Sequence, residues 1–138
     1  MKHNLRVLLT LTIIMQTMKG TAQQASKDSI EGIWKGTSLC QVKPSPCHDE
    51  NVVYRISRAA NGKIYSIQAN KIVNGVEEDM GTLDGSYDEA QHILTVTIKD
   101  RQDRTNVWLF RIEGKKMHGT LTIDEKTLYR IIEVKKAD

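Results

Sequence analysis

Residues 92–99 read HILTVTIK, and this stretch decides the fold class. Leu94, Val96 and Ile98 alternate with polar residues, so the apolar side chains of an extended strand would all lie on one face. Threonine, valine and isoleucine are also residues that strands favour. No ten-residue segment with helical periodicity competes with this pattern anywhere in residues 23–138. The stretch therefore predicts a half-buried β-strand in an all-β protein.

The same alternation recurs on both sides of this strand, with turn signals such as Asn61-Gly62 and Asn74-Gly75 between the segments. Gly81 and Gly85 predict a bulge or a sharp bend. Eight short strands with short connections favour an antiparallel up-and-down β-barrel, because closure removes exposed strand edges. A two-sheet sandwich is the alternative. The strands are expected at residues 31–40, 51–58, 63–73, 80–87, 92–99, 105–113, 116–123 and 128–135.

The N-terminal residues 1–22 have the pattern of an export signal. A basic start at Lys2 and Arg6 precedes a short apolar run, and Gly20 and Ala22 supply small residues at the −3 and −1 positions of a cleavage site. The apolar run is shorter than the roughly 20 residues of a membrane-spanning helix. We expect cleavage after Ala22 and a periplasmic or secreted protein. A disordered segment would then span residues 23–30 and a single barrel domain residues 31–138.

The charge balance argues against nucleic acid as a partner. The chain has 20 Lys and Arg residues, of which Lys2, Arg6 and Lys19 lie in the expected signal, so 17 remain against 17 acidic residues. A net charge of zero gives no basic footprint for nucleic acid or for an anionic membrane surface. No membrane-integral segment is expected after cleavage.

Two cysteines, Cys40 and Cys47, follow the first expected strand. In an exported chain this pair indicates a disulfide rather than a metal or redox site. The bridge would restrain a loop that contains Pro44 and Pro46, and closing so short a loop stabilises the fold by roughly 2–3 kcal/mol.

The first expected strand contains Gly32-Ile33-Trp34, and this Gly-x-Trp sequence resembles the opening of lipocalins and related calycin barrels. The resemblance implies a small β-barrel whose inward tryptophan closes one end, with a basic residue of the last strand across its ring. Arg130 is expected in that role, through a cation–π contact, because it shares the expected inward parity of Leu128, Ile132 and Val134. Gly32, Trp34 and Arg130 are therefore expected to be structural. The chain is shorter than a typical lipocalin and lacks the usual C-terminal helix.

Aromatic residues supply the candidate ligand-binding positions. Tyr54 and Tyr65 each share the apolar face of their strand. Both faces of residues 105–113 are apolar, so the sequence leaves two directions open for Trp108. Inward, Trp108 would join the tyrosines in the wall of a pocket; outward, it would form an apolar patch suited to a protein partner.

The segment from His48 to Glu50 is the densest polar cluster, and His48 beside a carboxylate is compatible with metal binding or proton transfer. The simpler interpretation is a loop at the barrel mouth, where Asp49 and Glu50 bind backbone groups or pair with Arg55. No nucleophile motif and no phosphate loop occur. We expect no enzyme activity, no cofactor and no metal site.

The sequence therefore favours an exported lipocalin-like protein that binds a small apolar or amphipathic ligand through Tyr54, Tyr65 and Trp108. The alternative is a protein-binding inhibitor of the protease or lysozyme type, whose disulfide loop between Cys40 and Cys47 inserts into a target cleft.

Overall fold

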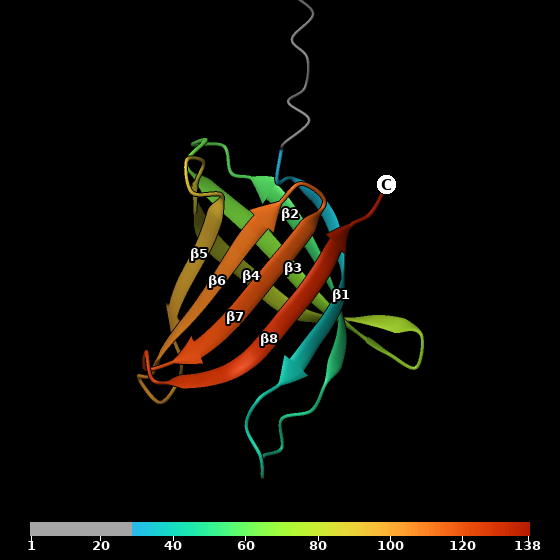
Figure 1. Cartoon of the computed structure of the whole chain (residues 1–138), viewed down its shortest axis with the longest axis vertical. Coiled ribbons are helices and arrows are strands. Elements are labelled where there is room, and N and C mark those ends of the chain that lie inside the picture. Colours follow the sequence, from blue (N-terminus) through green and yellow to red (C-terminus); the bar gives the residue numbers. More distant parts are fainter. Residues whose placement is uncertain (1–28) are drawn as a thin grey trace, which may run out of the picture.

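The computed structural model describes residues 29–138, which form eight antiparallel strands and no helix. The strands pair in chain order, and β8 returns to β1, so the sheet closes into a barrel (Figure 1). The strands are β1 (Gly32–Cys40), β2 (Glu50–Arg58), β3 (Ile64–Val73), β4 (Val76–Asp88), β5 (Ile93–Lys99), β6 (Thr105–Glu113), β7 (Lys116–Ile123) and β8 (Thr127–Lys136). The all-β, up-and-down barrel predicted from the sequence is confirmed.

Closure of the barrel between β1 and β8 depends on Gly36. A Cβ atom at this position would lie 2.0 Å from the backbone carbonyl oxygen of Glu133, far inside van der Waals contact. Gly36 pairs with Val134 in the β1–β8 register. Only glycine lets the two strands approach this closely.

One end of the barrel is sealed by Trp34, which is fully buried. Its indole Nε1 donates a hydrogen bond of 2.9 Å to the backbone oxygen of Ile30, and the Lys136 ammonium lies 5.7 Å from the ring centroid. Ile30 itself is 2% exposed, although the sequence analysis placed it in a disordered segment. The barrel domain therefore includes at least one residue before position 31.

The expectation that Arg130 covers Trp34 is wrong. The β1–β8 register sets Lys136 opposite Trp34 and Arg130 opposite Cys40. Six residues of strand, about 20 Å, separate the two basic residues. Parity had placed Arg130 toward the interior, but the register of β1 and β8 sets Lys136, not Arg130, beside Trp34.

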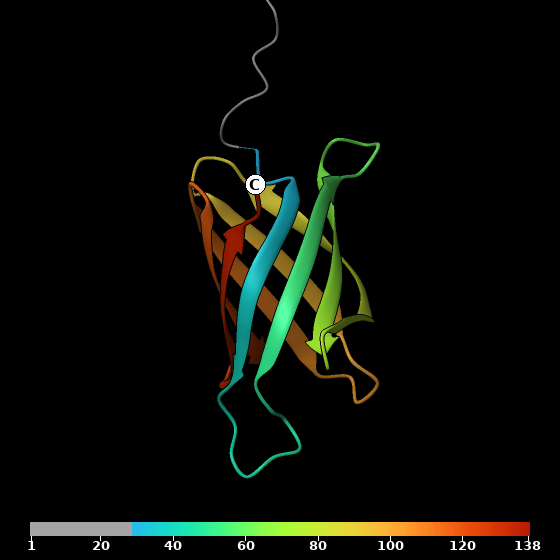
Figure 2. The ribbon, with the colours of Figure 1, turned by 90° about the vertical axis from the view of Figure 1, so that its right-hand side faces the viewer.

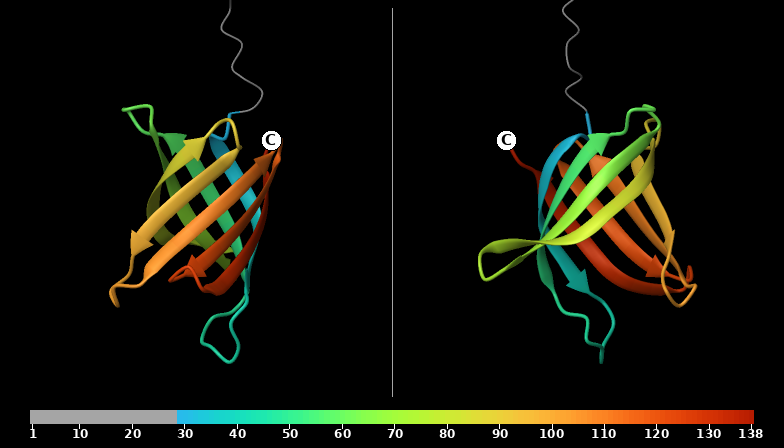
Figure 3. Two further views of the ribbon diagram at one scale, coloured as in Figure 1. Left: turned by 60° about the vertical axis from the view of Figure 1, so that its left-hand side comes forward. Right: turned by 180° about the vertical axis from the view of Figure 1, so that it is seen from behind.

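The hairpin of β3 and β4 extends beyond the barrel wall (Figure 3). The predicted fourth strand began at Met80, whereas β4 begins at Val76, because the pairing with β3 continues past a register shift between Ala69 and Asn70. Opposite this shift Gly81 has a φ of +109°, so the predicted bulge is present.

A charged contact fixes the base of the projecting hairpin. Arg55 donates two hydrogen bonds to the Glu77 carboxylate, at 2.8 and 3.1 Å, and Asn70 Nδ2 donates a third at 2.8 Å. These bonds to the ionised form, with that from Arg55 the largest effect, lower the pKa of Glu77 to about 2. Glu77 therefore joins β2, β3 and β4 outside the barrel.

The seam between β4 and β5 is the least paired part of the barrel. Only three residue pairs, which run from Ser86–Thr95 to Asp88–Ile93, connect these strands, whereas each other adjacent pair has at least seven. The ladder between β4 and β5 ends at Ser86 and Thr95 and does not continue toward the end of the barrel that carries the disulfide loop.

The expected export signal, its cleavage after Ala22 and residues 23–28 of the expected disordered segment lie outside the described residues. Residues 29–138 contain no helix that is long and apolar enough to cross a membrane.

Candidate ligand-binding site

The end of the barrel away from Trp34 is hollow. A cavity of about 310 Å³, which we call the inner cavity, is lined by largely apolar side chains from six strands and by three polar ones. This volume is at the lower end of the range typical of small-molecule sites, which are largely apolar with a few placed polar groups. The lining residues are Ser38, Glu50, Tyr54, Ala69, Met80, Leu83, Ile98, Trp108, Leu121 and Arg130.

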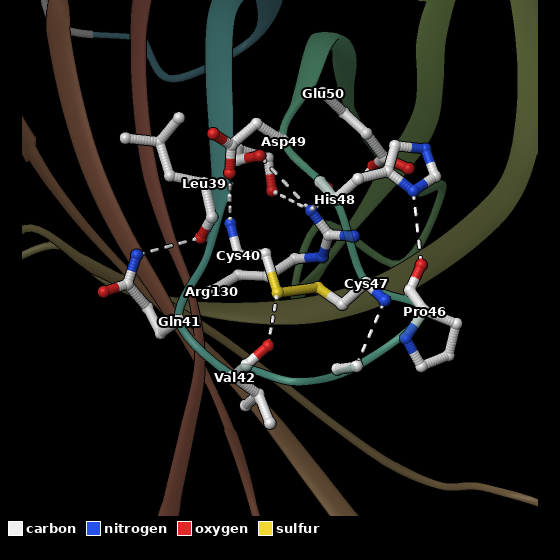
Figure 4. Close-up of a disulfide and its surroundings, with 12 residues drawn as sticks. Leu39, Cys40, Gln41, Val42, Pro46, Cys47, His48, Asp49, Glu50 and Arg130 are labelled. Carbon is white, nitrogen blue, oxygen red and sulfur yellow. Dashed lines mark hydrogen bonds and ion pairs between the residues drawn. A yellow bond between two sulfur atoms is a disulfide. The ribbon is translucent and has the colours of Figure 1, made fainter.

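The polar side of the inner cavity is organised around Arg130. Its Nη1 donates hydrogen bonds to the backbone oxygen and hydroxyl of Ser38, both at 3.2 Å, and to the backbone oxygen of His48 at 3.3 Å. The Glu50 carboxylate lies 3.5 Å from the same nitrogen. Figure 4 shows the guanidinium beneath the base of the disulfide loop, close to both His48 and Glu50. Arg130 thus ties the first residue of β2 to the middle of β8.

The Glu50–Arg130 ion pair is largely withdrawn from solvent, since each side chain is 14% exposed. Removing two charges from water costs several kcal/mol per ion, and buried ion pairs are often no more stabilising than well-packed apolar residues. Stability alone therefore gives little reason for a charged pair in an otherwise apolar barrel end.

Tyr54 separates the inner cavity from the packed core. Its ring meets Phe110 edge-on at a centroid distance of 5.9 Å, and the side chain is 5% exposed. Burial raises the pKa of Tyr54 well above its ordinary value, against the opposing effect of the Arg130 charge. The phenol therefore stays protonated and is a hydrogen-bond donor. Among the described residues its hydroxyl has no hydrogen-bond partner.

A second hollow, which we call the outer groove, continues from the inner cavity toward the disulfide loop. It has a volume of about 500 Å³ and shares Trp108 and Leu121 with the inner cavity. Its other lining residues come from the loop and from the adjacent ends of β6, β7 and β8. They are Val42, Pro44, Ser45, Pro46, Arg104, Asn106, Ile123 and Tyr129.

The loop from residue 41 to residue 49 extends beyond this end of the barrel (Figure 2). The Cys40–Cys47 disulfide predicted from the sequence is present. Asp49 accepts a hydrogen bond of 2.9 Å from the backbone nitrogen of Cys40, and Gln41 donates one of 2.9 Å to the backbone of Tyr129. The base of the loop is therefore fixed to both β1 and β8.

The structure places two of the three aromatic candidates in the inner cavity. Tyr54 and Trp108 both line it. The direction of Trp108, which the sequence left open, is inward: Phe110 and Ile112 share its face and are buried, whereas Leu109 is 39% exposed. Trp108 and Tyr54 therefore both belong to the wall of the inner cavity.

Tyr65 lies elsewhere. It is 5% exposed, meets Tyr87 edge-on at 5.9 Å and accepts a hydrogen bond from Arg58. It is part of the packed core and does not line either hollow.

The three residues from His48 to Glu50 make separate contacts and do not form one site. His48 Nδ1 lies 3.3 Å from the Pro46 carbonyl oxygen within the loop, Asp49 caps the end of β1, and Glu50 pairs with Arg130. Of the two expected alternatives, the hydrogen bond to a backbone group is made by Asp49, and the pairing with Arg55 does not occur because Arg55 binds Glu77. Within residues 29–138, no group of three or more His, Cys, Asp and Glu side chains could hold a metal ion.

Glu50 and Ser38 line the inner cavity but were not predicted as site residues from the sequence. Ser38 shares the inward parity of Trp34 on β1, which was a usable signal. Glu50 shares the inward parity of Val52 and Tyr54, but the sequence predicts that the second strand begins only at residue 51, which leaves Glu50 in the loop. Its pairing with Arg130 depends on closure of the sheet, which brings together residues 80 positions apart.

No protein-family model, no curated protein sequence and no solved structure matches this chain.

Proposed function

We propose that this chain is an exported, lipocalin-like binding protein that holds a small amphipathic molecule in the inner cavity. The observation that carries the proposal is one hollow barrel end with an apolar wall and a single polar side, formed by Ser38, Glu50 and Arg130. An apolar pocket with a few converging polar groups is the arrangement of a small-molecule site. The Gly-x-Trp resemblance and the export signal support the same function but come from the sequence alone.

The test is isothermal titration calorimetry of the oxidised protein with eight-carbon amphiphiles that carry anionic, cationic and neutral head groups. Ala69→Leu would fill part of the inner cavity, since Ala69 lines it and is 6% exposed. Ala90→Leu adds the same side chain at an exposed turn and is the matched control. We expect one-site binding of at least one amphiphile, weakened more than tenfold by Ala69→Leu and unchanged by Ala90→Leu.

Absence of binding by every amphiphile, or equal binding by both variants, would refute the proposal. Thermal unfolding of each variant shows whether it is folded at the temperature of the titration.

A second candidate, an inhibitor of a protease or lysozyme, is favoured by the projecting disulfide loop. This loop is fixed at its base and carries Pro44 and Pro46 on its exposed part. A pre-organised loop loses little conformational entropy when it enters a target cleft. Replacing Pro44, Ser45 and Pro46 together by alanine would remove inhibition under this alternative, and would leave binding in the inner cavity largely intact under the first proposal.

A further inference from the structure

The inner cavity carries two opposite charges and no others. Glu50 and Arg130 are the charged residues among those that line it, and they lie 3.5 Å apart. Because each charge offsets the other, the cavity presents a local dipole with no net charge. A ligand that enters therefore meets no uncompensated charge that a charged head group could neutralise.

The hydrogen-bonding capacity of the cavity is also mixed. All the hydrogen bonds that Arg130 donates within residues 29–138 come from Nη1. Its Nη2 and Nε remain as donors, and the Tyr54 hydroxyl adds another. On the acceptor side, the Glu50 carboxylate accepts no hydrogen bond from the described residues and contacts Arg130 only as an ion pair. The cavity therefore contains hydrogen-bond donors, on Arg130 and Tyr54, and an acceptor, on Glu50, whose hydrogen-bonding capacity the described residues do not fill.

We propose that the inner cavity selects an uncharged head group that both accepts and donates hydrogen bonds, such as a primary amide or an alcohol, on a short apolar tail. The inference rests on the proposed function and specifies the ligand class for that same cavity. The carbonyl or hydroxyl oxygen would accept from Tyr54 or Arg130, and the N–H or O–H group would donate to Glu50. A buried donor or acceptor left without a partner is costly, so a head group that supplies both roles is favoured.

Charged head groups are disfavoured by the same geometry. A carboxylate near Arg130 would also lie near Glu50, and an ammonium near Glu50 would also lie near Arg130. Like charges repel strongly where the surroundings are apolar, and such repulsion is a common source of selectivity.

The volume sets the tail length. About 310 Å³ corresponds to roughly ten water molecules, at about 30 Å³ each in the liquid. Octanamide and octanol, with nine or ten non-hydrogen atoms, are therefore suitable probes.

The experiment is isothermal titration calorimetry at pH 7 with octanamide, octanol, octanoate and octylammonium, on the wild type and on Glu50→Gln and Arg130→Gln. In the wild type we expect octanamide and octanol to bind at least tenfold more tightly than either ion. Glu50→Gln leaves the arginine uncompensated, so octanoate should gain at least tenfold. Arg130→Gln leaves the glutamate uncompensated, so octylammonium should gain by a similar factor.

Arg130→Lys, which keeps the positive charge, is the control and should keep the wild-type order of head groups. The wild-type ranking stands as a test by itself if a variant does not fold. If octanoate or octylammonium binds the wild type most tightly, this inference is overturned and the proposed function stays in place. The same holds if the order of affinities of the four compounds is unchanged in every folded variant. Failure of all four compounds to bind would overturn both.

Discussion

The Glu50 carboxylate lies 3.5 Å from the Arg130 guanidinium inside the barrel mouth, and each side chain is 14% exposed. These residues are brought together only by the return of β8 to β1. The pair defines the polar side of a cavity whose other walls are mostly apolar. A ligand whose head group forms hydrogen bonds with both Glu50 and Arg130 would account for the position of this ion pair and for the energetic cost of burying it.

The first prediction concerns the stability of this pair. Arg130→Met or Glu50→Leu leaves one mostly buried charge without its counterion. We expect either change to lower the free energy of unfolding by about 1–3 kcal/mol, less than for a fully dry pair because the cavity is open to water. The wild type, these two variants and the double variant that combines them form a double-mutant cycle. The double variant Glu50→Leu with Arg130→Met should lie within about 1 kcal/mol of the wild type. Urea denaturation measures all four proteins, and additive losses in the double variant would show that the residues do not act as a pair.

The second prediction concerns the sealed end. Lys136→Met should lower the free energy of unfolding by about 0.5–1 kcal/mol and shift the fluorescence of Trp34, because the ammonium lies 5.7 Å from the ring centroid. Arg130→Met should leave this fluorescence unchanged. A Trp108→Phe background leaves Trp34 as the only tryptophan, whose emission is excited selectively at wavelengths that tyrosine does not absorb. A spectral response to Arg130→Met but not to Lys136→Met would contradict the register described for β1 and β8.

The third prediction concerns acid stability. Hydrogen bonds from Arg55 and Asn70 lower the pKa of Glu77 to about 2 in the folded protein, from an ordinary value of 4.5. A lowered folded-state pKa stabilises the fold above the unfolded value and loses that contribution as the pH falls. The stability that Glu77 contributes should therefore be complete above about pH 5 and disappear between pH 4.5 and pH 2.

Thermal unfolding of the wild type and Glu77→Gln between pH 7 and pH 2 tests this expectation. The difference in Tm should be largest at neutral pH and shrink through the acid window. Glu78→Gln is the control on the same hairpin, since Glu78 makes only a 3.6 Å contact with Lys71. A wild-type advantage that stays constant down to pH 2 would be incompatible with the assigned pKa.

The fourth prediction concerns the β4–β5 seam. Strand pairing ends at Ser86 and Thr95, so backbone amides beyond this point lack ladder partners across the seam. We expect two sets of backbone amides to exchange with solvent faster than the amides of β7 and β8. They are the amides of residues 81–85 that do not bond to β3 and those of residues 96–99 that do not bond to β6. Hydrogen exchange followed by NMR measures this directly. Uniform protection across all eight strands would mean that the seam is closed in solution.

Much of the fold could be predicted from the sequence, because alternation of apolar and polar residues is a local property. The stretch from Ile93 to Lys99 and the turn signals between strands needed no knowledge of distant residues. Local reasoning erred at β4, where the acidic run beginning at Glu77 concealed a strand that extends past the barrel wall.

The candidate site was less accessible to prediction. Parity showed correctly that Trp34 and Arg130 face the interior, but the position of a side chain along the barrel axis depends on register across the closing strands. The same dependence moved Tyr65 into the packed core and made Lys136 the partner of Trp34. A bulge at Tyr129, between Leu128 and Arg130, also breaks the parity of β8, so Leu128, expected to face inward, is 40% exposed.

The proposed function and the proposed ligand class both place the apolar tail of a small neutral amphiphile in the inner cavity. The most direct measurement is the set of nuclear Overhauser effects between bound octanamide and the oxidised protein. We expect contacts from the tail to Met80, Leu83 and Trp108, and none to Tyr65. Contacts confined to the loop prolines or to the outer surface of the barrel would contradict the account.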